Sequence, residues 1–441
     1  MFADESTAST RKSMRIRLQT LGCRLNEAEL ETWARQFRER GCEIAPEPEP
    51  ADLVVINTCA VTKDAVRKSR KLLRRAQRDN PKARLVVSGC AASLENENLG
   101  EAGIDLLVAN ADKERLVEIA THKLSLPVMP ATATDPSADA LFVRGRQRAF
   151  VKIQDGCRYQ CTFCITTRAR GDERSRPAEQ ICDEINRLTA AGIQEVVLTG
   201  VHVGGYGSDR NADLTKLLTA ILRDTDLPRL RLGSLEPWDL TDGFWRLFGD
   251  PRLMPHLHLP LQSGADSVLR RMARRCQSGE FLRLVDAARA TVPGFNVTTD
   301  IIVGFPGESD DEWQQTLDLV QRIGFGHLHI FSYSPRAGTR AAAMPDQVPD
   351  QIKRARSREL HALGQKLKRA LLERQCGRSV KVLIEGRSSD AAGPFLTGYT
   401  PNYLPVRLRD AEAQSVNCIL PARLGIVTAE GDALNALPLA S

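Results

Sequence analysis

Apolar runs and helical stretches alternate along the first part of the chain. Three strand-like runs begin the series: RIRLQTLGC, DLVVINTCA and RLVVSGCAA. Between them lie helical stretches such as NEAELETWARQFRERG and TKDAVRKSRKLLRRAQRDN, and the run GIDLLVAN with the helix DKERLVEIATHK completes the series near residue 124. Strands that alternate with helices are typical of a parallel sheet, so the pattern predicts a parallel α/β domain over residues 14–125.

A second and longer series follows the stretch LPVMPATATDPSADA, whose composition is typical of a linker. This series has six strand-like runs: RAFVKIQDG, IQEVVLTG, RLRLGSLEP, HLHLPLQSG, NVTTDIIVGFPGE and HLHIFSYSP. Eight βα units close a full barrel, so six units predict an open, partial (β/α)6 barrel over residues 145–375.

The last segment, residues 376–441, differs in pattern from the rest of the chain. A long basic helix precedes it, PDQIKRARSRELHALGQKLKRALLERQ, and Gly and Pro then separate the short strands SVKVLIEG, GYTPNYLPVRL and GIVTAEG. This pattern predicts a small β-barrel. The chain as a whole is therefore expected to be an α/β protein of three domains.

Composition narrows the class of protein further. Of the 441 residues, 42% are hydrophobic and 26% charged, which is typical of a soluble globular protein. No apolar run approaches the ~20 residues that span a membrane, and the beginning MFADESTASTRKSM lacks the apolar centre of a signal peptide. We therefore expect a cytoplasmic protein without a membrane partner, in which the 11 cysteines are reduced.

Three of these cysteines lie within eight positions, in DGCRYQCTFCI. Cys157, Cys161 and Cys164, here called the close triad, follow the first strand of the second series. A structural zinc site needs four ligands, whereas a [4Fe-4S] cluster held by three thiolates keeps one iron open for a substrate or cofactor. The spacing favours such a cluster; the alternative is a zinc knuckle completed by Cys182 or a distant histidine.

Three other cysteines each end a strand of the first domain. Cys23, Cys59 and Cys90, here called the dispersed triad, occur in LGC, NTC and SGC. Successive parallel strands end at one edge of a sheet, so these thiols can converge although they are far apart in sequence. The alternative is that they are three buried structural cysteines. The remaining five are interpreted as packing residues: Cys42, Cys182, Cys276, Cys376 and Cys418.

The spacing C-x3-C-x2-C, with Phe163 before its last cysteine, resembles the signature of the radical S-adenosylmethionine (SAM) superfamily. The resemblance implies that the open iron binds SAM and that one electron cleaves it to a 5′-deoxyadenosyl radical. It also implies the partial-barrel fold. The cofactor-binding residues that it implies are Phe163, Thr199, Gly200, Ser234, Glu236, Gln262 and Asp300.

The motifs TLGCRLNEAELE, INTCAVT and SGC, placed ahead of the close triad, resemble the methylthiotransferases within that superfamily. The resemblance covers nearly the whole chain. It implies that the dispersed triad holds a second [4Fe-4S] cluster, which presents the sulfur to be inserted, so that all six cysteines are metal ligands with a catalytic function. The segment GYTPNYLPVRL resembles the TRAM domain, an RNA-binding module.

Among the branches of that family, LGCRLNEAELE, LTGVHVGGYG and GYTPNYLPV resemble the one that modifies N6-threonylcarbamoyladenosine beside the anticodon of tRNA. Arg24 stands where that branch more often has Lys. The isopentenyladenosine branch usually reads FGCQMN, and the ribosomal-protein branch LGCPKN. The implied reaction uses two SAM molecules, one for the methyl group and one for the radical that removes hydrogen from carbon 2 of adenine. It needs an external electron donor, such as a flavodoxin-like protein, and a sulfur donor.

Charge agrees with an RNA substrate. Two basic helices, TKDAVRKSRKLLRRAQRDNPKAR and IKRARSRELHALGQKLKR, can each contact several phosphates, although the net charge is only +6. In the small barrel, Tyr399, Tyr403, Asn402 and Arg407 are expected to contact a nucleic-acid strand.

The small barrel contains none of the six proposed metal ligands, so a chain truncated near Glu373 is expected to keep its iron. The alternatives are an RNA-binding iron–sulfur electron carrier and a radical SAM enzyme that acts on a protein side chain.

Overall fold

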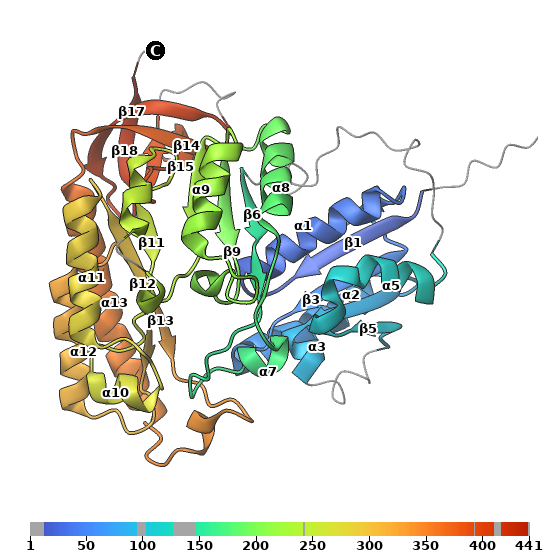
Figure 1. The fold of residues 1–441 in the computed structure, drawn as a ribbon, viewed down its shortest axis with the longest axis horizontal. Helices are drawn as coiled ribbons and strands as arrows, with labels where there is room; N and C mark the ends of the chain where they lie inside the picture. Colours follow the sequence, from blue (N-terminus) through green and yellow to red (C-terminus); the bar gives the residue numbers. More distant parts are fainter. Residues whose placement is uncertain are drawn as a thin grey trace, which may run out of the picture. The chain divides into compact units, whose positions relative to one another are not determined.

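The computed structural model describes residues 13–94, 103–126, 147–240, 243–391, 393–409 and 416–439. The chain forms two compact units, Met1–Val143 and Arg144–Ser441 (Figure 1). The polar beginning of the chain, residues 1–12, and the expected linker beyond Leu126 lie outside the described residues.

The first unit is built on a parallel sheet of five strands in the order β2-β1-β3-β4-β5. The strands are β1 (Arg15–Thr20), β2 (Glu43–Ile44), β3 (Leu53–Thr58), β4 (Arg84–Gly89) and β5 (Leu106–Val108). The helices are α1 (Arg24–Arg38), α2 (Lys63–Asp79), α3 (Cys90–Leu94), the 3-10 helix η2 (Asn110–Arg115) and α5 (Leu116–Lys123). The predicted parallel α/β fold is confirmed; the two-residue strand β2 was not predicted.

Alternation along the central strand β3 places helices on both faces of this sheet. Leu53 and Val55 belong to a hydrophobic cluster with Trp33 of α1, whereas Val54 belongs to a second cluster with Leu73 of α2. All six residues of β3 are buried, as expected for a strand covered on both faces. The strand order reverses between β1 and β3, and ligands of such sheets bind at the carboxyl ends of strands near this point.

The second unit begins with six parallel strands. They are β6 (Arg148–Lys152), β9 (Glu195–Thr199), β10 (Arg229–Leu232), β11 (His256–His258), β12 (Asn296–Val303) and β13 (His327–Ser332). Two three-stranded sheets, β10-β9-β6 and β11-β12-β13, join through parallel bridges such as Ser234 to His258. The predicted six-unit partial barrel is confirmed. A short hairpin of β7 (Gln154–Asp155) and β8 (Arg174–Ser175) follows β6.

The second unit also has seven α-helices among its described residues, the longer of which lie on the outer side of these strands. They are α7 (Thr166–Arg170), α8 (Ala178–Ala190), α9 (Leu214–Asp224), α10 (Asp266–Arg271), α11 (Ser278–Thr291), α12 (Asp310–Ile323) and α13 (Asp350–Glu373). Figure 1 shows α11, α12 and α13 beside β11–β13. Short 3-10 helices connect other elements: η4 (Val203–Gly205), η5 (Pro237–Asp239), η6 (Phe244–Gly249) and η7 (Arg340–Ala343).

The chain ends in a closed barrel of five strands in the order β14-β15-β16-β18-β17. The strands are β14 (Ser379–Asp390), β15 (Gly393–Tyr399), β16 (Pro405–Leu408), β17 (Ile419–Val427) and β18 (Leu434–Pro438). Their inward-facing residues, among them Val382, Leu396 and Leu424, form one hydrophobic cluster. The expected small β-barrel is confirmed.

This five-stranded barrel contacts the amino-terminal ends of the partial-barrel strands through a buried ionic network. Glu195, at the start of β9, accepts two hydrogen bonds of 3.0 Å from Arg231 and lies 3.2 Å from Arg148. Arg231 also donates to the carbonyl of Pro401, and Arg229 donates to that of Tyr399. The five-stranded barrel therefore closes the amino-terminal end of the partial barrel.

The same interface corrects the expectation that Tyr399, Tyr403 and Asn402 contact nucleic acid. The two tyrosine rings stack at 4.8 Å, and the guanidinium of Arg148 lies over both. Asn402 is buried and donates to the carbonyl of Gly294. Within the chain, these side chains serve the contact between the two barrels.

Arg407 is also engaged within the chain, since it forms ion pairs with Glu430 and Asp432. The expectation that its charge serves RNA is therefore not supported. The packing interpretation of the other cysteines is confirmed for Cys42 and Cys182, which are buried. It is wrong for Cys376 and Cys418, which are exposed.

Candidate active site with two cysteine triads

The loop of the close triad is anchored at its base by buried charges. Asp155, 1% exposed, pairs with Lys152 at 2.7 Å and with Arg170 at 2.9 Å. Its carboxylate also accepts the backbone N–H of Gly156 at 2.8 Å. Gly156 has φ +73°, and a Cβ there would lie 1.9 Å from the carbonyl oxygen of Asp172, so only glycine fits this turn. The loop therefore starts from a fixed conformation.

The far end of the loop is held by the carboxyl-terminal half of the partial barrel. Thr162 donates through its backbone to the carbonyl of Met272 and through its hydroxyl to that of Arg271. Phe163 packs against a buried cluster that includes Met272 and Phe305. The structure thus places Phe163, which the sequence suggested as a cofactor contact, in a packing position beside the loop.

The three thiols interact with one another. Burial, followed by the charges of Cys164 and Cys161, raises the pKa of Cys157 to about 12. Burial likewise raises the pKa of Cys161. Burial therefore favours the protonated thiols of Cys157 and Cys161, and a bound metal would stabilise their thiolates, as in known thiolate sites.

The three sulfurs of the close triad, all in the described part of the chain, do not form a set with all atoms within 4.8 Å of one another. Among the described residues, two sets of three candidate ligands have their atoms within 4.8 Å of one another, and neither contains more than one cysteine. One set is Cys157, Glu173 and His202, and the other is His258, Asp300 and His329. In a cubane each thiolate binds a different iron, so wider spacing of sulfurs is compatible with it. Neither set includes Cys182, so the zinc knuckle gains no support.

His202 is a functional candidate that the sequence reasoning missed, although its motif LTGVHVGGYG was recognised. Its ring nitrogens lie 2.6 Å from Glu173 and 2.5 Å from Asp239, so no lone pair remains for a metal. Burial opposes its charge, but Asp239 and Glu173 prevail and raise the pKa of His202. Glu173 lies in a loop and Asp239 ends η5, so no local sequence signal reveals that the two carboxylates meet at His202.

Glu236, another predicted cofactor contact, is engaged by Arg274. The two side chains form hydrogen bonds of 3.0 and 2.5 Å, and Arg274 lies 3.9 Å from the sulfur of Cys161. Trp238 lies under the same guanidinium, and its indole N–H is buried without a partner in the described structure. A buried donor without a partner, beside the close triad, fits a site that takes a polar cofactor.

Most of the other predicted contacts lie at or near the carboxyl ends of their strands. Thr199 ends β9 and is buried, and the adjacent Gly200 leaves room for Gln154, which accepts the backbone N–H groups of Val201 and His202. Further predicted residues are placed as follows: Ser234 is exposed after β10, Gln262 has φ +71° after β11, and Asp300 lies within β12. The rule that ligands bind at the carboxyl ends of parallel strands therefore fits Thr199, Ser234 and Gln262, but not Asp300.

The dispersed triad lies at the carboxyl ends of β1, β3 and β4, around the strand-order reversal. Two glycines allow the backbone beside Cys23 and Cys90 to lie close to the segment Thr58–Cys59. A Cβ at Gly22 would lie 2.8 Å from the Cβ and 2.9 Å from the sulfur of Cys59, and one at Gly89 would lie 2.3 Å from the carbonyl of Thr58. Both glycines have positive φ. Each directly precedes a cysteine of the triad, so the motifs LGC and SGC encode this approach.

Amide side chains surround these sulfurs. Asn110 donates to the sulfur of Cys90 at 3.8 Å, and Asn26 accepts from that of Cys23 at 3.9 Å. Asn26 also donates to the carbonyl of Thr58. Cys59 and Cys90 are buried and Cys23 is exposed, so a cluster bound here would have one open side. Asn26 and Asn110 were not predicted as site residues, although they lie in the segments CRLN and VAN at the ends of β1 and β5.

Comparison with known proteins agrees with this architecture. The model of the uncharacterized protein family UPF0004 matches residues 15–109, and that of the radical SAM superfamily matches residues 151–320. The threonylcarbamoyladenosine tRNA methylthiotransferase MtaB of Thermotoga maritima is 34% identical over 95% of this chain and 97% of its own. That of Bacillus subtilis is 35% identical over 90% and 91%. A tRNA-2-methylthio-N(6)-dimethylallyladenosine synthase of Methylacidiphilum infernorum is 33% identical over 88% of both chains.

The fold and the match to the superfamily model place this protein in the class of radical SAM proteins. The chain belongs to the radical SAM methylthiotransferase family, which confirms the resemblance seen in its motifs.

Solved structures agree at the level of the fold. The radical SAM methyltransferase TsrM of Kitasatospora setae has a TM-score of 0.58 at 16% identity and covers 75% of this chain and 77% of its own. The cobalamin-dependent radical SAM enzyme OxsB has a TM-score of 0.51 at 12% identity, with 81% and 56% covered.

Proposed function

We propose that the protein methylthiolates N6-threonylcarbamoyladenosine in tRNA, at carbon 2 of the adenine beside the anticodon. The observation that supports this most directly is the pair of cysteine triads at the carboxyl ends of parallel strands, in a chain that aligns over 95% of its length with a threonylcarbamoyladenosine tRNA methylthiotransferase. We assign residues 14–125, 145–375 and 376–441 to a sulfur-inserting domain, a radical SAM domain and a TRAM-like domain.

In this proposal each triad holds one [4Fe-4S] cluster. When bound, the clusters and SAM supply the radical, the methyl group and the inserted sulfur. The chain's own residues hold the clusters and orient the substrate. Asp155 and Arg170 fix the loop of the close triad, and Arg274 places a positive charge beside Cys161. An external one-electron donor and a sulfur donor complete the reaction, and a tRNA substrate implies work in the cytoplasm.

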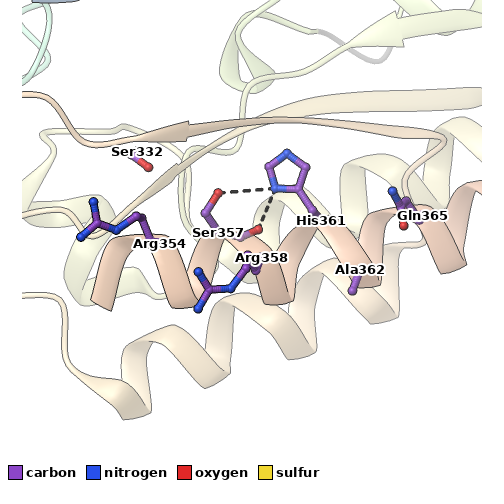
Figure 2. A pocket seen from close by; sticks show the side chains of 7 residues that line it. All are labelled: Ser332, Arg354, Ser357, Arg358, His361, Ala362 and Gln365. Atoms are coloured by element: carbon purple, nitrogen blue, oxygen red, sulfur yellow. Dashed lines mark hydrogen bonds between the residues drawn. The ribbon is translucent and has the colours of Figure 1, made fainter. Parts of the chain in front are cut away.

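The second basic helix offers a surface for the RNA backbone. An open groove runs between β13 and α13, lined by Ser332, Arg354, Ser357, Arg358, His361, Ala362 and Gln365. Figure 2 shows the two arginines and His361 on this helix, with the His361 ring hydrogen-bonded to Ser357. Arg354 and Arg358 have no ion-pair partner in the described part of the chain, whereas Arg356 on the same helix pairs with Glu308. The two arginines of this groove therefore suit phosphate contacts.

Nucleoside analysis tests the proposal. Bulk tRNA from cells that lack their own enzyme should gain 2-methylthio-N6-threonylcarbamoyladenosine when this protein is expressed, and should not gain it with the close triad changed to alanine. Conversion of isopentenyladenosine instead would favour the isopentenyladenosine branch of the family. Modification of a ribosomal protein would favour the ribosomal-protein branch. An iron–sulfur electron carrier would form no 5′-deoxyadenosine from SAM.

No helix among the described residues has the length and apolar character of a membrane span.

A further inference from the structure

Three polar side chains meet on adjacent strands of the partial barrel. They are His258 of β11, Asp300 of β12 and His329 of β13, and their candidate ligand atoms lie within 4.8 Å of one another. The strand register places Asp300 directly opposite His329. The Nε2 atom of His258 lies 3.1 Å from a carboxylate oxygen of Asp300. The three residues form one group, here called the histidine–aspartate group.

This group faces the interior of the partial barrel. Side chains alternate along a strand, and the neighbours Leu257, Ile301 and Leu328 are buried on the opposite, helix-covered face. Leu328 faces α13, where a Cβ at Gly364 would lie 3.1 Å from it. The floor of the interior lies one step lower, where the ring of His256 packs at 4.8 Å against Tyr403 of the five-stranded barrel.

The group is not built like a packed core or a metal site. Both ring nitrogens of His258 are engaged, one with the hydroxyl of Thr298 at 3.0 Å and one with Asp300, so neither is left to ligate a metal. The Asp300 side chain remains 25% exposed, His329 is exposed, and Phe331 on the same face is 47% exposed. Polar and apolar surface that stays accessible inside a barrel suits a ligand.

We propose that the histidine–aspartate group recognises the N6-threonylcarbamoyl substituent of the target adenosine and so sets substrate choice. This inference rests on the proposed function. The substituent carries N–H and O–H donors together with a carboxylate. The Asp300 carboxylate, held in place by His258, accepts from a donor of the substituent, and the imidazole of His329 donates to the carboxylate of the substituent. Carbon 2 and the N6-bearing carbon flank the same ring nitrogen of adenine, so holding the substituent also positions carbon 2.

The same group discriminates against an isopentenyl substituent, which is wholly apolar. Such a substituent would cover Asp300 and the histidines without offering hydrogen bonds, and a site built for a polar group rejects an analogue that lacks it by large factors. The relatives act on both nucleosides at similar overall identity, 34% and 33% for two of them, so a local determinant of this kind is needed.

Binding of short RNA tests the inference without the catalytic reaction. The probes are two anticodon stem–loops, one carrying threonylcarbamoyladenosine and one carrying plain adenosine, titrated against the full chain by fluorescence anisotropy. Asp300→Asn and His329→Phe should each lower the preference for the modified RNA by about tenfold to a hundredfold, because one hydrogen bond to a charged group is lost. Affinity for the unmodified RNA should not change. Asp286→Asn and His122→Phe are matched controls on exposed helix positions and should keep the preference.

A parallel comparison of kcat/KM for tRNA with threonylcarbamoyl- or isopentenyladenosine should show the same loss of selectivity. Equal weakening of both RNAs in the variants would overturn the inference, as would stoichiometric zinc that disappears in Asp300→Asn. If the wild-type protein forms the methylthio product of threonylcarbamoyladenosine and the variants retain full selectivity, only this inference fails. If the wild-type protein acts only on isopentenyladenosine, the proposed function fails first.

Discussion

Removing the charge of Glu195 should destabilise the second unit strongly. Glu195 is 1% exposed, accepts two hydrogen bonds of 3.0 Å from Arg231 and lies 3.2 Å from Arg148. In Glu195→Gln the buried arginines keep their charges but lose the carboxylate that balances them. Breaking a buried ion pair from one side costs about 3–5 kcal/mol, which for a unit of this size lowers the melting temperature by about 6–20 °C.

Differential scanning calorimetry of the full chain at pH 7 measures this effect. The matched control is Glu385→Gln, because Glu385 also binds Arg148 but its side chain is 25% exposed, so solvent limits the loss to about 1 kcal/mol. Glu179, on α8, provides an exposed control whose change to Gln should shift the melting temperature by less than about 2 °C.

The pH dependence gives a second readout. Burial acts to raise the pKa of Glu195, but the charges of Arg231 and Arg148 prevail and lower it below its ordinary value. A carboxyl group with a lowered folded pKa stabilises the protein above its unfolded pKa, and this contribution is lost as the pH falls through the folded value. The difference between wild type and Glu195→Gln should therefore be full near pH 7 and shrink below about pH 4. Equal melting temperatures at pH 7 would refute the view that this network joins the two barrels.

Further predictions concern iron, chemistry and RNA. Anaerobically reconstituted protein should hold about eight irons, and alanine at all three positions of the close triad should leave about half, by iron assay. Alanine at the dispersed triad should stop methylthiolation while 5′-deoxyadenosine still forms, by chromatography of the products. Truncation after Glu373 should yield unfolded or aggregated chain instead of the iron-containing protein expected from the sequence, because it exposes the buried arginines. Arg354→Gln with Arg358→Gln should weaken tRNA binding and reduce the salt slope by roughly 1.4–1.8, more than Lys366→Gln does.

The sequence predicted the features that repeat along the chain. Each strand of the partial barrel is an apolar run of ordinary length, and parallel sheets bring strand ends to one side, so the position of Cys23, Cys59 and Cys90 along one edge of the first sheet followed from topology alone. The structure explains the glycines of LGC and SGC, because a side chain at Gly22 or Gly89 would clash with Cys59 or Thr58. Features that depend only on strand direction and residue spacing can therefore be predicted from the sequence pattern.

Features that depend on pairing between distant segments were missed or wrong. Arg148 contacts Glu385 across 237 positions, and no periodicity indicates such a partner. Tyr399 and Tyr403 illustrate the difficulty, because aromatic side chains on a small β-barrel look the same in sequence whether RNA or protein covers them. His202 could not be predicted for the same reason, since Glu173 and Asp239 reach it from two other segments of the chain.

The closed floor of the partial barrel constrains how the substrate enters. Tyr403, Arg231 and Glu195 occupy the amino-terminal end, so a base that reaches the histidine–aspartate group must come from the carboxyl-terminal side, past the close triad, or through the open edge at β13. A nucleobase inside a folded anticodon loop is stacked on its neighbours and is too wide to enter with them. The adenosine therefore has to leave the stack, which costs least in a single-stranded loop. The arginines at the groove of α13 lie beside that same open edge and can hold the flanking phosphates while the base is extruded.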